Sequence, residues 1–273
     1  SVRLKTENEK VGKEFHIGGT VLRRLPVARR LPVVVFEPAH LQLLTESPDK
    51  RRAFFDDIIE QTTLGYEKTR RDYKRVLAQR NALLKRQPSA DQLFVWDVRL
   101  SELGAQIATA RQEFIAEHKT QLTELYAKLT HKKHTASLRY QASVPGTDYA
   151  GGMLKQLKTR IQVDIERGFT SVGPHRDDVV PLLDGHELML TGSRGEVRTM
   201  LLALKILELS TIEKALDIKP ILLLDDVFSE LDGARRRALT SYLKDHQTFI
   251  TTTDADIVVQ HFLDNCHVIP IAA

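Results

Sequence analysis

The sequence is almost without cysteine, because Cys266 is the only one in 273 residues. A single cysteine excludes an internal disulfide, and with it the small secreted domains that disulfides hold together. No apolar run reaches the roughly 20 residues that a membrane-spanning helix needs, and no signal peptide opens the chain. We therefore expect a cytoplasmic protein that has no membrane partner.

Aromatic residues are also few, at 6%, but a hydrophobic content of 42% and a charged content of 28% are ordinary for a globular protein. A chain of 273 residues is long enough to bury a substantial core as one large domain or two. The net charge of +4 is compatible with a nucleic-acid partner and does not require one. Composition therefore leaves the function to the motifs.

The sequence lacks a phosphate-binding loop of the form Gly-x-x-x-x-Gly-Lys-Ser/Thr. Gly18 and Gly19 are not followed by a lysine and instead predict a hairpin turn. Gly151 and Gly152 precede Met153 and do not fit the motif either. We expect that the chain as it stands does not hydrolyse ATP by itself.

Residues 221–226 read I-L-L-L-D-D, an aliphatic run that meets two carboxylates. The run predicts a strand buried on both faces, and the acids should emerge at its C-terminal edge because they are costly inside a core. In open α/β sheets ligands bind at that edge, and carboxylates there suit a Mg²⁺-bound nucleotide. A buried strand followed by a helix-capping Asp is an equal alternative on these residues alone.

Upstream of this run, the segment around Gly195 predicts the start of a helix. Ser193 and Glu196 have the spacing of a capping box. Gly195 disfavours a helix but permits close approach to the backbone, and a helix N-terminus attracts anions. Downstream, residues 248–253 predict a second strand, which ends at Asp254.

Hydrophobic periodicity divides the rest of the chain into strand-rich and helical parts. The predicted elements are a hairpin at 15–22, a strand at 31–36, helices at 48–62, 66–86 and 91–129, a strand at 136–141, a helix at 149–168 and a hairpin over 179–190 with an Asp-Gly turn. The second and third helices are joined at Pro88 and predict an antiparallel pair. We expect an α/β head made of residues 1–44 and 135–273, interrupted by a helical lobe at 45–134.

Five segments, in this order, resemble the RecF family of DNA replication and repair proteins, which is related to SMC and Rad50 heads within the ABC-type ATPase superfamily. They are residues 75–85, 173–178 (G-P-H-R-D-D), 193–196 (S-R-G-E, like the signature motif), 222–226 (like the Walker B motif) and 229–232 (S-E-L-D, like the D-loop). The resemblance runs from about Phe15 to the C-terminus. The family begins with a P-loop, so the resemblance implies a fragment that lacks it.

The resemblance implies a partial ABC-type ATPase head, a mixed sheet with flanking helices, into which a helical second lobe is inserted. Asp225 would hold Mg²⁺ and Asp226 would orient the attacking water, as the two catalytic carboxylates. Ser193 and Gly195 would bind the γ-phosphate of ATP held by a second molecule. Ser229 and Asp232 of the D-loop would lie at the seam of that dimer. For Asp254, a switch that senses the γ-phosphate and a cap of the strand end are equally good interpretations.

A stripe of basic side chains follows the helix predicted at 66–86. Its members are Lys68, Arg70, Arg71, Lys74 and Arg75, with Arg80, Lys85 and Arg86 further along. Given the resemblance, phosphate contacts along duplex DNA and an ordinary solvated helix face are equal interpretations. A metal site at His175 and Asp177 is disfavoured, because no further ligands cluster nearby in the sequence. The alternative for residues 173–178 is a turn whose Arg and Asp pair with neighbours.

The leading hypothesis is therefore a RecF-type protein of DNA damage repair and the SOS response. It would bind duplex DNA and single-/double-strand junctions, dimerise with ATP, and work with RecR- and RecO-type mediators. The full-length protein would be a slow ATPase that uses ATP and Mg²⁺, while this chain alone would hold no tightly bound cofactor. One alternative is a non-enzymatic interaction scaffold. Another is a chromosome-associated or transport-type ABC ATPase, which the short helical insertion and the lack of a membrane-coupling sequence disfavour.

Overall fold

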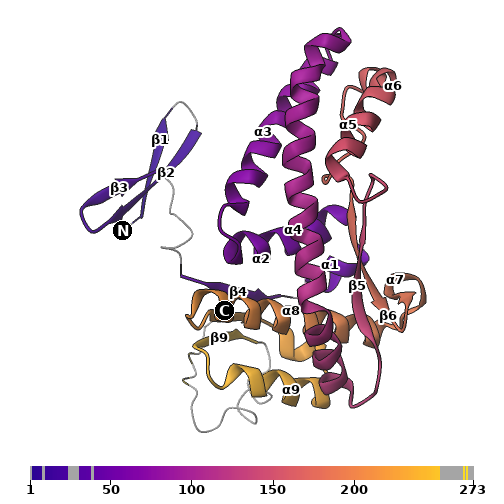
Figure 1. Ribbon diagram of the computed structural model, residues 1–273. Helices are drawn as coiled ribbons and strands as arrows, with labels where there is room; N and C mark the ends of the chain where they lie inside the picture. Colours follow the sequence, from indigo (N-terminus) through magenta and orange to yellow (C-terminus); the bar gives the residue numbers. More distant parts are fainter. Residues whose placement is uncertain are drawn as a thin grey trace.

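The computed structural model describes residues 2–7, 10–23, 31–37, 40–252, 267 and 269 (Figure 1). The strands are β1 (Val2–Glu7), β2 (Lys10–Ile17), β3 (Thr20–Leu22), β4 (Val33–Phe36), β5 (Ala136–Gln141), β6 (Asp178–Leu183), β7 (His186–Glu187), β8 (Ile221–Asp225) and β9 (Thr248–Thr251). The helices are α1 (Leu41–Thr45), α2 (Pro48–Thr62), α3 (Tyr66–Leu84), α4 (Ala90–Thr130), α5 (Tyr149–Thr159), α6 (Ile161–Arg167), α7 (Leu188–Thr191), α8 (Arg194–Leu216), the 3-10 helix η3 (Val227–Glu230) and α9 (Gly233–Leu243). The mixed α/β class expected from the sequence is confirmed.

The aliphatic run forms β8, the central strand of a parallel sheet with the order β4-β8-β9. On one face, Val34, Leu222 and Leu224 are fully buried and join the main hydrophobic cluster. On the other face, Leu223 is 37% exposed and Phe249 is 55% exposed. The prediction that this strand is buried on both faces is therefore wrong for the described part of the chain, in which side chains cover the sheet fully on one face only.

A second sheet has the antiparallel order β5-β6-β7. The predicted Asp-Gly turn is present, with φ of 50° at Asp184 and 83° at Gly185. The residues after β7 differ from the prediction, because Leu188–Thr191 forms the short helix α7 instead of continuing a strand. Residues 188–190 are three consecutive apolar residues, and such a short run has neither the periodicity of a strand nor that of a helix. The sequence therefore did not decide between the two.

The sheet β1-β2-β3 is built from two consecutive hairpins at the N-terminus. The turn predicted at Gly18 and Gly19 is confirmed, because it joins β2 to β3 with φ of 55° and 79° at the two glycines. Glycine adopts these left-handed angles without the steric cost that a Cβ atom brings.

The predicted antiparallel helix pair is confirmed as α3 and α4, which pack side by side (Figure 1). The helix α4 has 41 residues, which makes it about 60 Å long. It extends beyond α3 to contact α8, α9 and β5, so one helix belongs to both the helical part and the sheet-bearing part of the molecule. Among the residues that the structure describes, none of the helices has both the length and the apolar character needed to cross a membrane.

The single helix predicted at 149–168 is instead two helices, α5 and α6. The break falls at Arg160, whose φ of −95° and ψ of 7° are not helical, and Gly168 ends α6 with a left-handed φ of 71°. Because α5 packs along α4, this segment adds to the helical part although it follows β5 in sequence. The assignment of the helical lobe to residues 45–134 stays a prediction.

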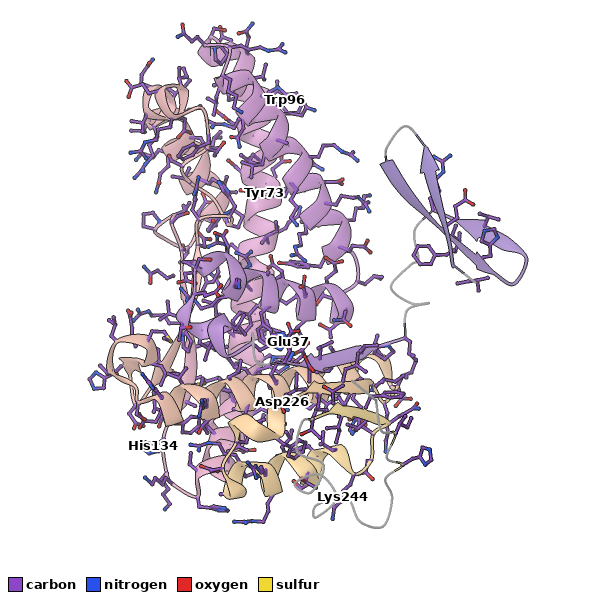
Figure 2. All side chains as sticks on the ribbon, turned by 180° about the vertical axis from the view of Figure 1, so that it is seen from behind. Glu37, Tyr73, Trp96, His134, Asp226 and Lys244 are labelled. Atoms are coloured by element: carbon purple, nitrogen blue, oxygen red, sulfur yellow. The ribbon has the colours of Figure 1, made fainter. Side chains whose placement is uncertain are left out.

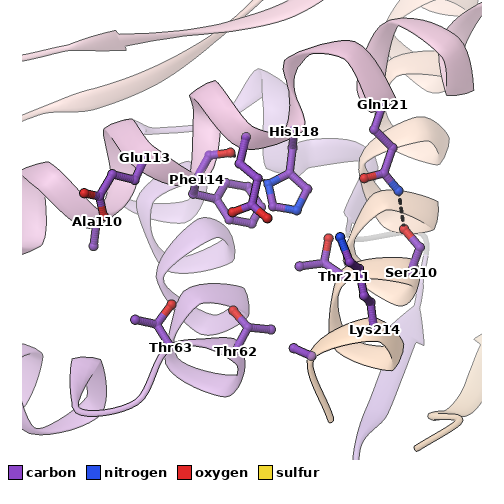
Figure 3. A pocket seen from close by; sticks show the side chains of 12 residues that line it. Thr62, Thr63, Ala110, Glu113, Phe114, His118, Gln121, Ser210, Thr211 and Lys214 are labelled. Carbon is purple, nitrogen blue, oxygen red and sulfur yellow. Dashed lines mark hydrogen bonds between the residues drawn. The ribbon is translucent and has the colours of Figure 1, made fainter. Parts of the chain in front are cut away.

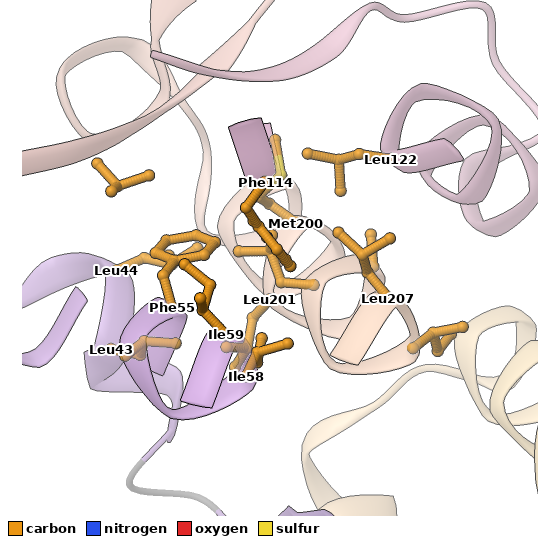
Figure 4. Packing of buried hydrophobic residues seen from close by; sticks show 14 of the residues in the cluster. Leu43, Leu44, Phe55, Ile58, Ile59, Phe114, Leu122, Met200, Leu201 and Leu207 are labelled. Atoms are coloured by element: carbon orange, nitrogen blue, oxygen red, sulfur yellow. The ribbon is translucent and has the colours of Figure 1, made fainter. Parts of the chain in front are cut away.

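The main hydrophobic cluster lies where α2, α4 and α8 meet (Figure 4). Phe55 and Ile59 of α2 pack there with Phe114 of α4 and with Met200 and Leu201 of α8. Truncating a buried phenylalanine such as Phe55 to alanine typically costs about 3–5 kcal/mol. Since α8 begins at the signature-like motif, this cluster holds that motif against the rest of the fold.

Candidate functional site

The C-terminal edge of the parallel sheet carries both predicted catalytic carboxylates, of which Asp225 is exposed and Asp226 is half-buried. Asp225 is the last residue of β8, is exposed, and accepts a hydrogen bond from the Thr251 hydroxyl of the neighbouring strand. On the other side, Phe36 at the end of β4 is in register with Leu224, so the next residue, Glu37, lies beside the Asp225 position (Figure 2). Glu37 was not among the predicted site residues, although an acid directly after a valine-rich strand is a usable signal.

His40 lies beside Glu37 at the same edge. The backbone N–H of Glu37 donates to His40 Nδ1 over 3.1 Å. Burial, together with the positive charge of Lys205, lowers the pKa of His40 to about 4. The imidazole is therefore neutral at physiological pH.

Asp226 adopts a left-handed backbone conformation, with φ of 46° and ψ of 27°. Its N–H donates to the carbonyl of Thr251 over 3.0 Å, which holds the residue against β9. A non-glycine residue in this region costs roughly 1–2 kcal/mol, although Asp tolerates it better than most. Strain of this kind accumulates at functional sites, where the surrounding structure maintains it.

The edge fits a magnesium ion that arrives with a nucleotide. Within the described ranges, no group of three or more His, Cys, Asp or Glu side chains is placed to hold a metal ion. Mg²⁺ is typically bound by one or two carboxylates together with substrate phosphates and water. The exposed carboxylate of Asp225 matches that requirement and would supply one ligand, while phosphates and water would supply the others.

The signature-like motif forms the N-terminus of α8, and its predicted capping box is present. Ser193 Oγ accepts from the Glu196 N–H over 3.3 Å, and Glu196 Oε2 accepts from the Ser193 N–H over 2.8 Å. Hydrogen bonding from the Ser193 N–H lowers the pKa of Glu196. Ser193 itself is exposed, so its side chain faces solvent at the positive end of the helix dipole.

Gly195 has no steric reason for being glycine among the described residues. A Cβ atom at this position would lie 3.5 Å from Arg235 Nη2 and 4.0 Å from Ser193 Oγ, which are ordinary contacts. Glycine in a helix costs about 1 kcal/mol relative to alanine. Packing among the residues that the structure describes therefore does not require glycine at position 195.

The D-loop-like segment runs from η3 to Asp232, which caps α9. Asp232 Oδ1 accepts from the Arg235 N–H over 2.9 Å, and Asp232 also pairs with the Arg235 guanidinium. The side chain of Ser229 and the whole of Asp254 lie outside the described residues.

Four members of the predicted basic stripe are exposed on α3: Lys68, Arg71, Lys74 and Arg75. The buried face of the same helix carries Tyr66 and Tyr73, of which Tyr73 is labelled in Figure 2. Arg70 is placed differently, because its guanidinium is half-buried. Its Nη1 atom lies 2.7 Å from Asp57 and 3.0 Å from Glu60.

The inclusion of Arg80 in this stripe is wrong, because Arg80 is fully buried. Its Nε atom donates to Asp97 over 2.6 Å, and its Nη1 atom donates to Asp164 over 2.8 Å and to Thr170 over 2.9 Å. A buried guanidinium needs partners of this kind. Arg80 therefore joins α3, α4 and α6 inside the helical part.

Residues 173–178, which are the loop before β6 and the first strand residue Asp178, form a polar joint between the helices and the β5-β6-β7 sheet. The sequence indicated a turn whose Arg and Asp pair with neighbours, but not this connecting role. Asp177 is fully buried and accepts hydrogen bonds from the Tyr140 hydroxyl, from the Tyr149 hydroxyl at 2.7 Å and from the Ser143 N–H at 2.6 Å. Burial raises the pKa of Tyr149, which keeps its hydroxyl protonated as a donor. The sequence signal for a buried carboxylate here was the pair of acids between the apolar residues Val172 and Val179.

The same segment contacts the helices through three arginines. Arg52 of α2 donates to the carbonyl of Asp177. Arg51 of α2 donates to both carboxylate oxygens of Asp178, at 3.0 and 2.6 Å. Arg111 of α4 donates to the carbonyl of Pro174 over 2.8 Å and to Asp56 over 2.8 and 2.9 Å. The loop therefore fixes α2 and α4 relative to the β5-β6-β7 sheet.

His175 is enclosed within this joint. Its Nδ1 atom lies 2.6 Å from the Tyr73 hydroxyl, and its Nε2 atom lies 3.1 Å from the carbonyl of Thr170. Burial lowers the pKa of His175 to about 4. Gly173 beside it has φ of 125°, and a Cβ atom there would lie 2.6 Å from the Tyr73 hydroxyl, so the joint requires glycine.

A pocket of about 330 Å³ lies between the end of α2, the middle of α4 and the end of α8 (Figure 3). His118 in its wall stacks on Phe114 with ring centroids 4.3 Å apart, and Gln121 donates to the Ser210 hydroxyl over 2.8 Å. None of the predicted site residues lines this pocket. Its walls combine acidic and basic side chains and do not single out one class of ligand.

Comparison with known proteins decides between the families that these features permit. No family model matches the chain. The chain is 36% identical over 249 residues to the DNA replication and repair protein RecF of Acetivibrio thermocellus, which covers 87% of the chain and 68% of that protein. It is 36% identical over 264 residues to the protein of the same name from Alkaliphilus oremlandii, covering 92% and 70%. The chain belongs to the RecF family.

Solved RecF structures confirm the fold. The recombination mediator protein RecF of the RecFOR pathway, solved with ATPrS, matches with a TM-score of 0.82 at 27% identity, over 93% of this chain and 71% of that one. The ATP-bound RecF structure matches with the same TM-score of 0.82 at 28% identity, over 90% and 69%. The RecF resemblance is therefore confirmed, and with it the DNA replication, DNA repair and ATP-binding character of the family.

Proposed function

We propose that the C-terminal sheet edge of this RecF-family chain is the magnesium and hydrolysis side of an ATP site. The exposed Asp225 carboxylate, held by Thr251 at the end of the central strand, carries this proposal. Asp225 would hold Mg²⁺, which neutralises phosphate charge when bound. Asp226 would accept a hydrogen bond from the attacking water. The Asp226 side chain is one methylene shorter than that of glutamate, which suits slow hydrolysis of ATP.

The signature-like motif is proposed to serve ATP bound to a second molecule. Ser193 is exposed at the N-terminus of α8, and the glycine at position 195 is unexplained by contacts among the described residues. Both facts suit the close approach of an anion to the helix N-terminus. ATP would then join two copies of the protein, with Ser229 and Asp232 at the seam and Asp254 as the γ-phosphate sensor.

The exposed basic residues of α3 are proposed to contact DNA phosphates. Lys68, Arg71, Lys74 and Arg75 lie on a solvent-facing surface of one helix. These cations would contact the phosphates of a duplex without reading its sequence. Binding would therefore be independent of sequence and sensitive to salt. We place this activity at single-/double-strand junctions in the cytoplasm, together with RecR- and RecO-type mediators.

The test uses the protein expressed from its complete reading frame, with mass measured by light scattering. Asp226→Asn keeps Asp225 and its metal, so ATP should form a dimer that persists after wild type has dissociated. Ser193→Arg should abolish the dimer while the monomer still binds ATP. Asp245→Asn, on an exposed residue beyond α9, is the matched control and should behave as wild type.

Two outcomes would contradict the proposal. Loss of ATP binding by the Ser193→Arg monomer would place Ser193 in the pocket of its own chain. A wild-type protein whose mass does not change with ATP would instead favour a non-enzymatic DNA- or protein-interaction scaffold with an ABC-like head. The capping box is compatible with that scaffold, because it accounts for Ser193 and Glu196 without a nucleotide.

A further inference from the structure

Arg235 lies in the first turn of α9 and contacts both the D-loop-like segment and Gly195 of the signature-like motif, which is 40 residues before it in sequence. Its Nε atom donates to Thr199 Oγ1 over 2.8 Å, and its Nη2 atom donates to the carbonyl of Gly195 over 3.1 Å. Its Nη1 atom pairs with the carboxylate of Asp232 at the end of the D-loop-like segment. One guanidinium therefore contacts the first turn of α8 and the cap of α9 at once.

The partners of Arg235 are themselves held in place. Thr199 is fully buried, and its hydroxyl donates to the carbonyl of Gly195 over 2.8 Å. The Gly195 carbonyl thus accepts from two side chains, which fixes the orientation of its peptide group. Asp232 is held by the backbone N–H of Arg235 as well as by its guanidinium.

The neighbouring arginine has a different task. Arg236 Nε donates to the carbonyl of Phe228 over 2.8 Å, so it joins α9 to η3, the 3-10 helix in which the D-loop-like segment begins. That segment and α9 therefore form one unit, and Arg235 joins this unit to α8. A planar guanidinium bonds in several directions at once, which the single ammonium of lysine does not reproduce.

We propose that Arg235 is a positioning residue that makes the D-loop and the signature-like motif a single rigid surface for the partner subunit. The proposal rests on the ATP-dependent dimerisation proposed above. Ser193 and Gly195 would meet the partner's γ-phosphate, and Asp232 would meet the partner's body. Both must reach the dimer in a fixed relative position, and the Arg235 contacts maintain that position within each monomer.

The test compares Arg235→Ala, Arg235→Lys and Thr199→Val with the control Arg237→Ala, an exposed position on the same helix. In the protein from the complete reading frame, Arg235→Ala should weaken ATP-driven dimerisation by about tenfold or more, since several bonds to a charged group are lost. ATP binding by the monomer should not change. Arg235→Lys should restore only part of the loss, because it keeps the charge of the Asp232 pair without the bonds to α8. Arg237→Ala should dimerise as wild type does.

Amide hydrogen exchange, measured on the same proteins without ATP, tests the role of Arg235 within the monomer independently of dimerisation. Arg235→Ala and Thr199→Val should both speed exchange in the first turn of α8 while the exchange of β5 and β6 stays unchanged. The inference would be overturned if the wild type dimerises with ATP and Arg235→Ala shows the same dimerisation and the same amide exchange as the wild type. Wild-type protein that never dimerises would overturn the proposed function, and faster exchange in the variants would still establish the link. If Arg235→Ala does not fold, Thr199→Val decides by the same two measurements.

Discussion

The hydroxyl of Tyr149 donates a 2.7 Å hydrogen bond to the fully buried carboxylate of Asp177. This contact joins α5 to the loop before β6, and Tyr140 of β5 donates to the same carboxylate. The Ser143 N–H completes the set. Three hydrogen-bond donors stabilise a carboxylate in the interior, and each of these buried donors in turn relies on the carboxylate as its acceptor.

Asp177→Ala is expected to lower the free energy of unfolding by about 3–5 kcal/mol, because it leaves buried donors without an acceptor. Urea unfolding followed by circular dichroism measures the loss. Asp245→Ala is the control, as an exposed Asp near the C-terminal strand, and should change stability by about 0.5 kcal/mol or less. Equal stability of the two variants would show that the joint contributes nothing.

Arg80→Met is expected to cost about 3–5 kcal/mol of unfolding free energy, since Asp97 and Asp164 are left buried without their cation. Burial already raises the pKa of Asp97. Adding Asp97→Leu and Asp164→Leu to Arg80→Met should recover part of the loss, because no uncompensated charge then remains. Denaturant midpoints measure both steps. A triple variant that is less stable than the single one would contradict this account.

Acid should destabilise the protein through His175 in particular. Its folded pKa is lowered to about 4 from an ordinary 6.5, so the stability it contributes is complete above pH 6.5 and is lost as the pH falls toward 4. His175→Gln keeps a donor and an acceptor but does not titrate. Between pH 7.5 and 4.5, wild type should lose about 1–3 kcal/mol more than this variant.

The control for the His175 experiment is His131→Asn, which changes an exposed histidine at the end of α4 and should leave the pH slope unaltered. His40 adds a slope of the same sign, because its pKa is also lowered to about 4. That contribution is common to all the proteins and cancels in the comparison. Identical slopes for wild type and His175→Gln would refute the role of His175.

Changing Lys68, Arg71, Lys74 and Arg75 to Glu should weaken duplex binding and reduce the salt slope by roughly 3–4 units, at about 0.9 per lost phosphate contact. Arg70 is left intact, because its pairs with Asp57 and Glu60 support the fold. A control protein with Lys119, Lys128, Lys133 and Lys244 changed to Glu has the same net charge. Fluorescence anisotropy over a salt series measures both. Equal loss in the two proteins would assign the effect to net charge and not to α3.

Local chemistry accounts for the elements that the sequence predicted well. The helix at 48–62 begins after Ser47 with proline in its first turn, and α2 spans those residues. The turn at Gly18 and Gly19 needs left-handed angles that glycine supplies. The capping box at Ser193 and Glu196 depends only on residues three apart. These features need no distant partner, and so they can be read from neighbours in the chain.

The sequence by itself determined the helix pair, the capping box, the acid-tipped strand and the order of RecF-like motifs. Only the tertiary structure decided that Arg80 is buried while Lys74 on the same helix is exposed, because the partner Asp164 is 84 residues away. It also decided that Asp177 is a joint and that Arg235 bridges two motifs. The sequence does not distinguish a charged side chain that is solvated from one that pairs with a buried opposite charge. The partner charge is distant in sequence and comes close to the side chain only when the chain folds.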